Sequence, residues 1–170
     1  TKRYNVTTDV LVVIAEVGAT VGINPCRSDD VMAAQDNLHW YLENIDGVTK
    51  VISLSSVAKR ALSGYAEGNL KWTYLPRNER ALAFATSVVD PSTGLINEAC
   101  SIMPIYVFTK DHKATTISHI IETVESYNDK YRDLDESITW RVQIQKPTDG
   151  TDIIPFAAFS GTTTQSLDVL

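Results

Sequence analysis

The decisive stretch of this chain is Asp9-Val-Leu-Val-Val-Ile-Ala-Glu16. Its strand length and its β-branched apolar residues predict a buried β-strand, bounded by Gly18 and Gly22. A helix is predicted next, at about 28–45, and a second strand over 48–54. Residues 8–54 therefore form a strand, a helix and a strand in succession.

The first predicted helix has one apolar face. Ser28 is a suitable N-cap, and the two aspartates that follow it suit the positive end of a helix. The residues that share the apolar face are Val31, Ala34, Gln35, Leu38, Tyr41, Leu42 and Ile45. Gln35 is the only polar member of this face, and Asp46-Gly47 ends the helix.

The same order of elements returns over 100–146. A strand is predicted at 105–109, and an alternating, half-exposed strand at 138–144. Pro104 cannot donate to a strand ladder, so the strand at 105–109 is expected to begin after it or to carry a bulge there. The helix between these strands has a buried face made of Ile117, Ile120, Ile121, Val124, Tyr127 and Tyr131.

Two such units joined in sequence most economically form an α+β, ferredoxin-like βαββαβ sandwich. We expect four antiparallel strands in the order 4-1-3-2, with both helices on one face. Residues 1–170 then form one domain, with its core at 8–54 and 100–146. The insert at 55–98 is predicted to hold two short helices, at 56–66 and 78–88. This topology places both chain ends at one pole and the insert at the other.

Composition narrows the classes of function. The 15 basic and 21 acidic residues give a net charge of −6, with no basic cluster to neutralise phosphates, so nucleic acid is not expected as a partner. The longest apolar runs are far shorter than the roughly 20 residues of a membrane-spanning helix. Because the chain begins at Thr1 rather than Met, we expect a segment of a longer protein.

Three groups of residues carry a family resemblance. They are Asp46-Gly-Val-Thr-Lys-Val-Ile-Ser53; Glu67-Gly-Asn-Leu-Lys-Trp72 with Leu75-Pro-Arg-Asn78; and Thr93-Gly-Leu-Ile-Asn97 through Cys100-Ser-Ile-Met-Pro104 to Phe108-Thr-Lys-Asp-His-Lys113. In combination they resemble an extracytoplasmic loop of exporters of the resistance-nodulation-division (RND) superfamily, in its MmpL-like and Patched-like group. The resemblance covers about residues 4–131 and ends before Phe156-Ala-Ala-Phe-Ser-Gly161, where the family usually has a different segment.

The resemblance implies a porter domain in the periplasm, on a proton-driven transporter of the bacterial inner membrane. Its partners would be the transporter's own membrane helices, the second porter domain and another protomer. In that family the proton-relay carboxylates sit in membrane helices, so none is expected in this chain. The transported substrate cannot be read from one domain, because porter pockets form between domains.

Cys26 and Cys100 are 74 residues apart, yet the expected topology brings both to the pole of the insert. A disulfide between them is geometrically reasonable and would suit an oxidising compartment. The alternative is two unpaired cysteines that act as small apolar residues.

Three aromatic residues are the candidate contact residues. Trp40 lies opposite the apolar face of its helix, where it could contact a neighbouring domain. Trp72 and Tyr74 lie in the insert, where they could line a substrate path or touch a partner. The alternative is that the insert folds back and buries all three.

Other functions find little support in the sequence. His112 and His119 are about 10 Å apart along a helix, too far to share a metal ion. The loop at 22–27, with Asn24 and Arg27, resembles the anion-binding loop of acylphosphatases, but Asn24 does not match the family's position for its water-positioning Asn. No catalytic triad, Walker loop or dinucleotide motif occurs, so neither an enzyme nor a cofactor is predicted. A periplasmic sensing or partner-binding module remains the alternative function.

Overall fold

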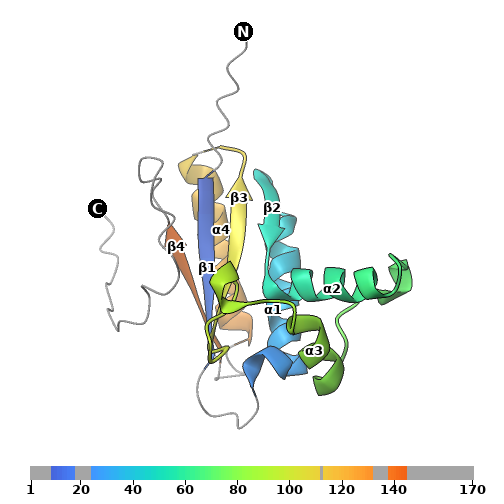
Figure 1. Cartoon of the computed structure of the whole chain (residues 1–170). Helices are drawn as coiled ribbons and strands as arrows, with labels where there is room; N and C mark the ends of the chain where they lie inside the picture. The colour runs from blue at the N-terminus through green and yellow to red at the C-terminus, as the bar shows by residue number, and fades with distance from the viewer. Residues whose placement is uncertain (1–8, 18–23, 112, 132–137, 145–170) are drawn as a thin grey trace.

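The computed structural model describes residues 9–17, 24–111, 113–131 and 138–144, and shows an α+β chain (Figure 1). In chain order the elements are β1 (Asp9–Val17), η1 (Pro25–Arg27), α1 (Asp29–Glu43), β2 (Val48–Ile52), α2 (Leu54–Tyr65), η2 (Leu70–Trp72), α3 (Glu79–Thr86), η3 (Pro91–Thr93), β3 (Ile102–Thr109), α4 (Ala114–Tyr131) and β4 (Ile138–Ile144). The elements named η are single turns of 3₁₀ helix. The predicted α+β class is confirmed.

The four strands form one antiparallel sheet in the order β2-β3-β1-β4. Strand β1 is central, pairing with β3 on one side and β4 on the other. Leu11, Val13 and Ala15 on one face of β1 are buried, and so are Val12 and Ile14 on the other. An apolar run without alternation is typical of a strand covered on both faces. The prediction of a buried first strand is therefore confirmed.

Helices α1 and α4 lie on the same side of the sheet (Figure 1). They contact each other through Tyr127, whose hydroxyl donates to the carbonyl of Ala34 at 2.8 Å. The main buried residues between these helices and the sheet are Leu11, Val13, Leu38, Leu42, Met103, Ile105, Val107, Ile120 and Val124. Most of the predicted helix faces are buried, but Ala34, Ile117 and Ile121 are only half-buried and Tyr41 is exposed. The Tyr131 side chain lies outside the described residues.

The prediction for Pro104 was wrong. Strand β3 begins two residues before it, and Pro104 stands opposite Ile14 without a shift in register. The amide of Val17 donates to the carbonyl of Ser101 at 2.8 Å, so alternate residues of β3 from Ser101 onward bond to β1. The backbone nitrogen of Pro104 therefore faces away from β1, towards the side of β3 on which β2 pairs only as far as Tyr106. Among the described residues, no strand pairs with Pro104 on that side, so its missing N–H removes no ladder hydrogen bond.

Strand β2 is shorter than predicted, because Ser53 begins a helix. The Ser53 hydroxyl accepts a hydrogen bond from the Ser56 amide, and the Ser56 hydroxyl accepts one from the Ser53 amide, which makes a capping box. Leu54 thus becomes the first residue of α2 and is fully buried. The two predicted insert helices are present, as α2 and as α3, which Asn78 caps.

The two ends of the sheet differ in what they carry. Leu11 near the start of β1 stands opposite Ile144 at the end of β4. The other end of the sheet holds the end of β1, the start of β3 and both cysteines. The predicted position of the chain ends cannot be compared with the structure, because residues 1–8 and 145–170 lie outside the described part.

Candidate functional site

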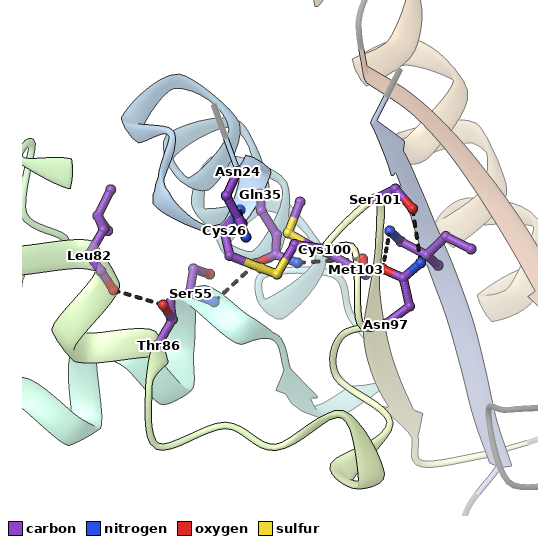
Figure 2. Close-up of a disulfide and its surroundings, with 11 residues drawn as sticks. Asn24, Cys26, Gln35, Ser55, Leu82, Thr86, Asn97, Cys100, Ser101 and Met103 are labelled. Atoms are coloured by element: carbon purple, nitrogen blue, oxygen red, sulfur yellow. Dashed lines mark hydrogen bonds between the residues drawn. A yellow bond between two sulfur atoms is a disulfide. The ribbon is translucent and has the colours of Figure 1, made fainter. Parts of the chain in front are cut away.

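A disulfide joins Cys26 and Cys100 beside the start of β3 (Figure 2). Their Cα atoms are 5.7 Å apart and both residues are buried. Asn24 sets the turn before α1, because its side-chain oxygen accepts the Cys26 amide at 3.0 Å. The bonded pair is the one that the strand topology brings together.

The backbone at Cys100 is in the left-handed region, with φ of +54°. This conformation is uncommon for residues other than glycine and persists where the surroundings hold it. Asn97 makes three hydrogen bonds that hold the backbone around Cys100 in this conformation. Its carbonyl accepts the Cys100 amide at 3.0 Å, its side-chain oxygen accepts the Ile102 amide at 3.1 Å, and its side-chain nitrogen donates to Ser101 Oγ at 2.9 Å. This turn therefore fixes Cys100 from both sides (Figure 2).

Gln35, the polar exception on the apolar face of α1, joins three elements. Its side-chain oxygen accepts the Ser55 amide of α2 at 3.0 Å, and its side-chain nitrogen reaches the Met103 carbonyl of β3 at 3.5 Å (Figure 2). Gln35 and Ser55 are fully buried. Buried polar groups are costly unless they are paired, so this residue specifies how α2 sits against α1 and the sheet.

His39 makes a second buried connection between α1 and α2. Its Nδ1 lies 2.8 Å from Ser53 Oγ, which in turn lies 2.8 Å from Ser55 Oγ. Ser53 Oγ also accepts the Ser56 amide at 3.2 Å as the cap of α2. The network therefore ties the first turn of α2 to the middle of α1.

The charge state of His39 is set by its position. Burial is the largest influence and lowers the pKa of the imidazole below its ordinary value. The carboxylates of Glu43 and Asp36 act against this lowering, while the cations Lys59 and Arg60 act with it. Because the lowering prevails, the neutral imidazole is the favoured form at neutral pH.

Ser53, His39 and Glu43 together have the composition of a catalytic triad. Glu43 Oε2 lies 3.8 Å from His39 Nε2, on the side of the ring opposite Ser53. A nucleophile must reach its substrate, but Ser53 is 0% exposed and its hydroxyl already has three partners. The arrangement therefore holds two helices together and is not a nucleophile with its base.

A groove of about 660 Å³ lies between α1 and α2, next to His39. Lys59 Nζ of α2 lies 2.5 Å from Asp36 Oδ1 of α1, so an ion pair joins the two sides. The lining residues are Asp36, Asn37, His39, Trp40 and Glu43 of α1; Ser56, Lys59, Arg60, Ser63 and Gly64 of α2; and Gly68 and Thr73 beyond α2. Figure 1 shows α2, which forms one side of the groove, projecting sideways from the sheet.

The three candidate aromatic residues are all exposed. Trp40 is 60% exposed at the groove, and Trp72 and Tyr74 in the insert are 48% and 51% exposed. The rings of Trp72 and Tyr74 stack with centroids 6.2 Å apart. The alternative in which the insert buries all three is therefore wrong. Trp40 lies at the groove, whereas Trp72 and Tyr74 lie together in the segment that links α2 and α3.

The two other sites weighed from the sequence gain no support. His119 is exposed on α4, while His112 lies outside the described residues. Within residues that the structure describes, no group of three or more His, Cys, Asp or Glu could hold a metal ion. In the loop before α1, the side-chain oxygen of Asn24 is used to cap the turn, so it is not directed at an attacking water. Arg27 is exposed beside it.

Among the helices in the described ranges, none is long and apolar enough to cross a membrane. No protein-family model, no curated protein and no solved structure matches this chain.

Sequence reasoning missed Met32, His39 and the α2 side of the groove. Met32 and His39 lie just outside the predicted apolar face of α1, yet both are buried. His39 is covered because α2 packs on a second side of α1. The available signal was the run after Ser53, where a capping box precedes an amphipathic helix whose apolar side needs a partner.

Proposed function

We propose that this chain is a periplasmic porter domain of a proton-driven RND exporter of the bacterial inner membrane, in the MmpL-like and Patched-like group. The residues that resemble this family span about 4–131 of the chain. The proton-relay carboxylates then belong to membrane helices outside this chain, and its own role is in substrate passage and inter-domain contact.

The fold supports this proposal. Two strand-helix-strand units, the sheet order β2-β3-β1-β4, and α1 and α4 on one side agree with a ferredoxin-like βαββαβ sandwich. We assign the chain to that fold, as a single domain with an insert from α2 to η3 between its second and third strands.

The observation that carries the proposal is the placement of the two ends of this scaffold. The start of β1 and the end of β4 lie side by side, since Leu11 stands opposite Ile144. The disulfide and the start of β3 lie at the other end of the sheet. A domain that is entered and left at one end can be inserted between two consecutive membrane helices, with its far end projecting away from the membrane.

The disulfide supports the placement of this domain in the periplasm. Disulfides form and persist in oxidising compartments such as the bacterial periplasm and are rare in the cytosol. Cys26 and Cys100 are both buried, so their bond has the surroundings of a structural crosslink. This agrees with an extracytoplasmic domain.

The insert offers the surface for partners. Leu70 is 82% exposed, and Trp72 and Tyr74 stand close to it in sequence and are half-exposed. Exposed apolar and aromatic residues that gather in one segment are typical of contact surfaces. We propose that this segment meets the second porter domain or another protomer of the intact transporter.

The full-length parent protein provides the test. Its gene is expected to encode membrane helices directly before and after this domain, together with a second related domain. In a variant whose cysteines outside this domain are removed, Glu67→Cys on the exposed turn after α2 should react with a membrane-impermeant maleimide from the periplasmic side. The same protein without Glu67→Cys should stay unlabelled, because its two cysteines are bonded. Labelling that requires lysis of the inner membrane would contradict the proposal.

The second candidate function is a periplasmic sensing or partner-binding module. The groove between α1 and α2 favours it, because a groove of about 660 Å³ can hold a small ligand. A parent with fewer than two flanking membrane helices, or without a second related domain, would decide for this alternative.

A further inference from the structure

Gly64 leaves one side of the groove between α1 and α2 bare. It lies in the last turn of α2, where a glycine is less favourable than alanine by up to about 1 kcal/mol. A Cβ built at Gly64 would meet nothing within 4 Å. Packing within the described chain therefore does not require a glycine here, and the effect of its missing side chain is to keep the groove open.

Trp40 presents a flat, fixed surface to the same groove. Its ring contacts Tyr41 edge-on, with centroids 5.2 Å apart and planes at 75°. Tyr41 in turn meets the ring of Tyr127 at 6.0 Å. Trp40 is thus held from one side while 60% of its surface stays exposed. An aromatic ring held in this way can bind a ligand with little loss of conformational entropy.

The groove carries hydrogen-bonding groups of both kinds and no net charge. The carboxylates of Asp36 and Glu43 balance the cations Lys59 and Arg60, while His39 favours its neutral form. Lys59 is already paired with Asp36.

Several groups of the groove are available to a ligand. In the part of the chain that the structure describes, the side chains of Asn37, Arg60 and Ser63 have no hydrogen-bond partner. Glu43 on the α1 side is an acceptor and Arg60 on the α2 side is a donor. A ligand that both donates and accepts along its length can therefore use both sides at once.

We propose that this groove binds a short oligosaccharide, with one sugar ring stacked on Trp40 and its hydroxyl groups bonded to Asn37, Glu43 and Arg60. The C–H face of a pyranose ring is weakly positive and matches the negative face of an indole. Each hydroxyl both donates and accepts, which suits a neutral groove with mixed polar sides. Because the groove carries no net charge, it offers no net attraction to a strongly anionic ligand. This proposal stands independently of the exporter assignment.

The test uses the 170-residue chain with cellotetraose and tetra-N-acetylchitotetraose as probes, and tetraalanine as a peptide of similar length. Binding is measured by isothermal titration calorimetry and by the NMR signal of the Trp40 indole N–H. We expect at least one saccharide to bind with a dissociation constant of about 1 mM or below and to shift that signal. Trp40→Ala should weaken binding by about tenfold or more.

The variant Gly64→Leu distinguishes an effect on the groove from an effect on the stability of the fold. Because its side chain enters open space, it should weaken saccharide binding about tenfold or more while the thermal unfolding midpoint stays or rises. Val88→Ala, at an exposed apolar residue after α3 that does not line the groove, should leave binding unchanged. The proposal is overturned if neither saccharide binds, if only tetraalanine binds, or if Val88→Ala weakens binding as much as Trp40→Ala does.

Discussion

The scaffold of β1–β4, α1 and α4 differs from the insert of α2, η2, α3 and η3 in where it leaves its apolar surface. Eight large apolar or aromatic side chains are exposed in the described residues, and six of them belong to the insert. They are Tyr65, Leu70, Trp72, Tyr74, Phe84 and Val88. The other two, Trp40 and Tyr41, lie on α1. Over β1, β2, β3, α1 and residues 114–130 of α4, the scaffold therefore buries most of its apolar surface, whereas the insert keeps much of its own available for contact.

The insert is nevertheless part of the same core. Leu54, Leu82 and Ala85 from its helices are fully buried and belong to one cluster with Leu42 and Ile105 of the scaffold. Its inner side is thus fixed and its outer side is free. A segment with this division is expected to unfold with the scaffold while being able to change its surface contacts.

Removal of the disulfide should have the largest effect, and it affects both regions at once. The 74-residue separation between Cys26 and Cys100 includes α1, β2 and the whole insert. In the loop-entropy model, Cys26→Ser with Cys100→Ser should lower the free energy of unfolding by about 4 kcal/mol, as measured by urea denaturation. Thiol titration of the denatured, unreduced 170-residue chain, with both cysteines in place, should find no reactive thiol, and two reactive thiols would contradict the bond.

A matched pair of leucines tests whether the two regions share one core. Leu82 in α3 and Leu42 in α1 are both fully buried. Leu82→Ala and Leu42→Ala should each lower the free energy of unfolding by about 3 kcal/mol, because each leaves a cavity. Both variants should keep a single cooperative transition by calorimetry. A separate early transition in Leu82→Ala alone would show that the insert is an independent unit.

The smallest effect is expected from His39, at the contact between the two regions. Burial lowers the pKa of His39 in the folded state, so the unfolded chain binds more protons near and below its ordinary value of 6.5. The stability from this residue is present above that pH and is progressively lost as the pH falls through 6.5. His39→Gln should flatten this part of the pH profile of the free energy of unfolding. If the slope of this profile is unchanged in His39→Gln, burial of His39 between α1 and α2 does not contribute to the pH dependence of stability.

The order of elements could be predicted because it follows from local patterns. The run from Val10 to Ala15 and the spacing of Leu38 and Leu42 reveal strand and helix without reference to distant residues. The place of Pro104 could not be predicted, because it depends on where β2 ends beside β3. Likewise, the burial of His39 depends on α2, which lies later in the chain.

For this protein, the sequence by itself determined the α+β class, the order of strands and helices, and the presence of two helices in the insert. These features follow from backbone geometry and from the spacing of apolar residues within each element. Only the tertiary structure decided that Trp40 stays exposed, that α2 packs across α1, that Gln35 and His39 tie these helices together, and that a groove lies between them. These features depend on residues 14 or more positions apart coming into contact, as His39 and Ser53 do, and packing rather than local propensity selects such contacts.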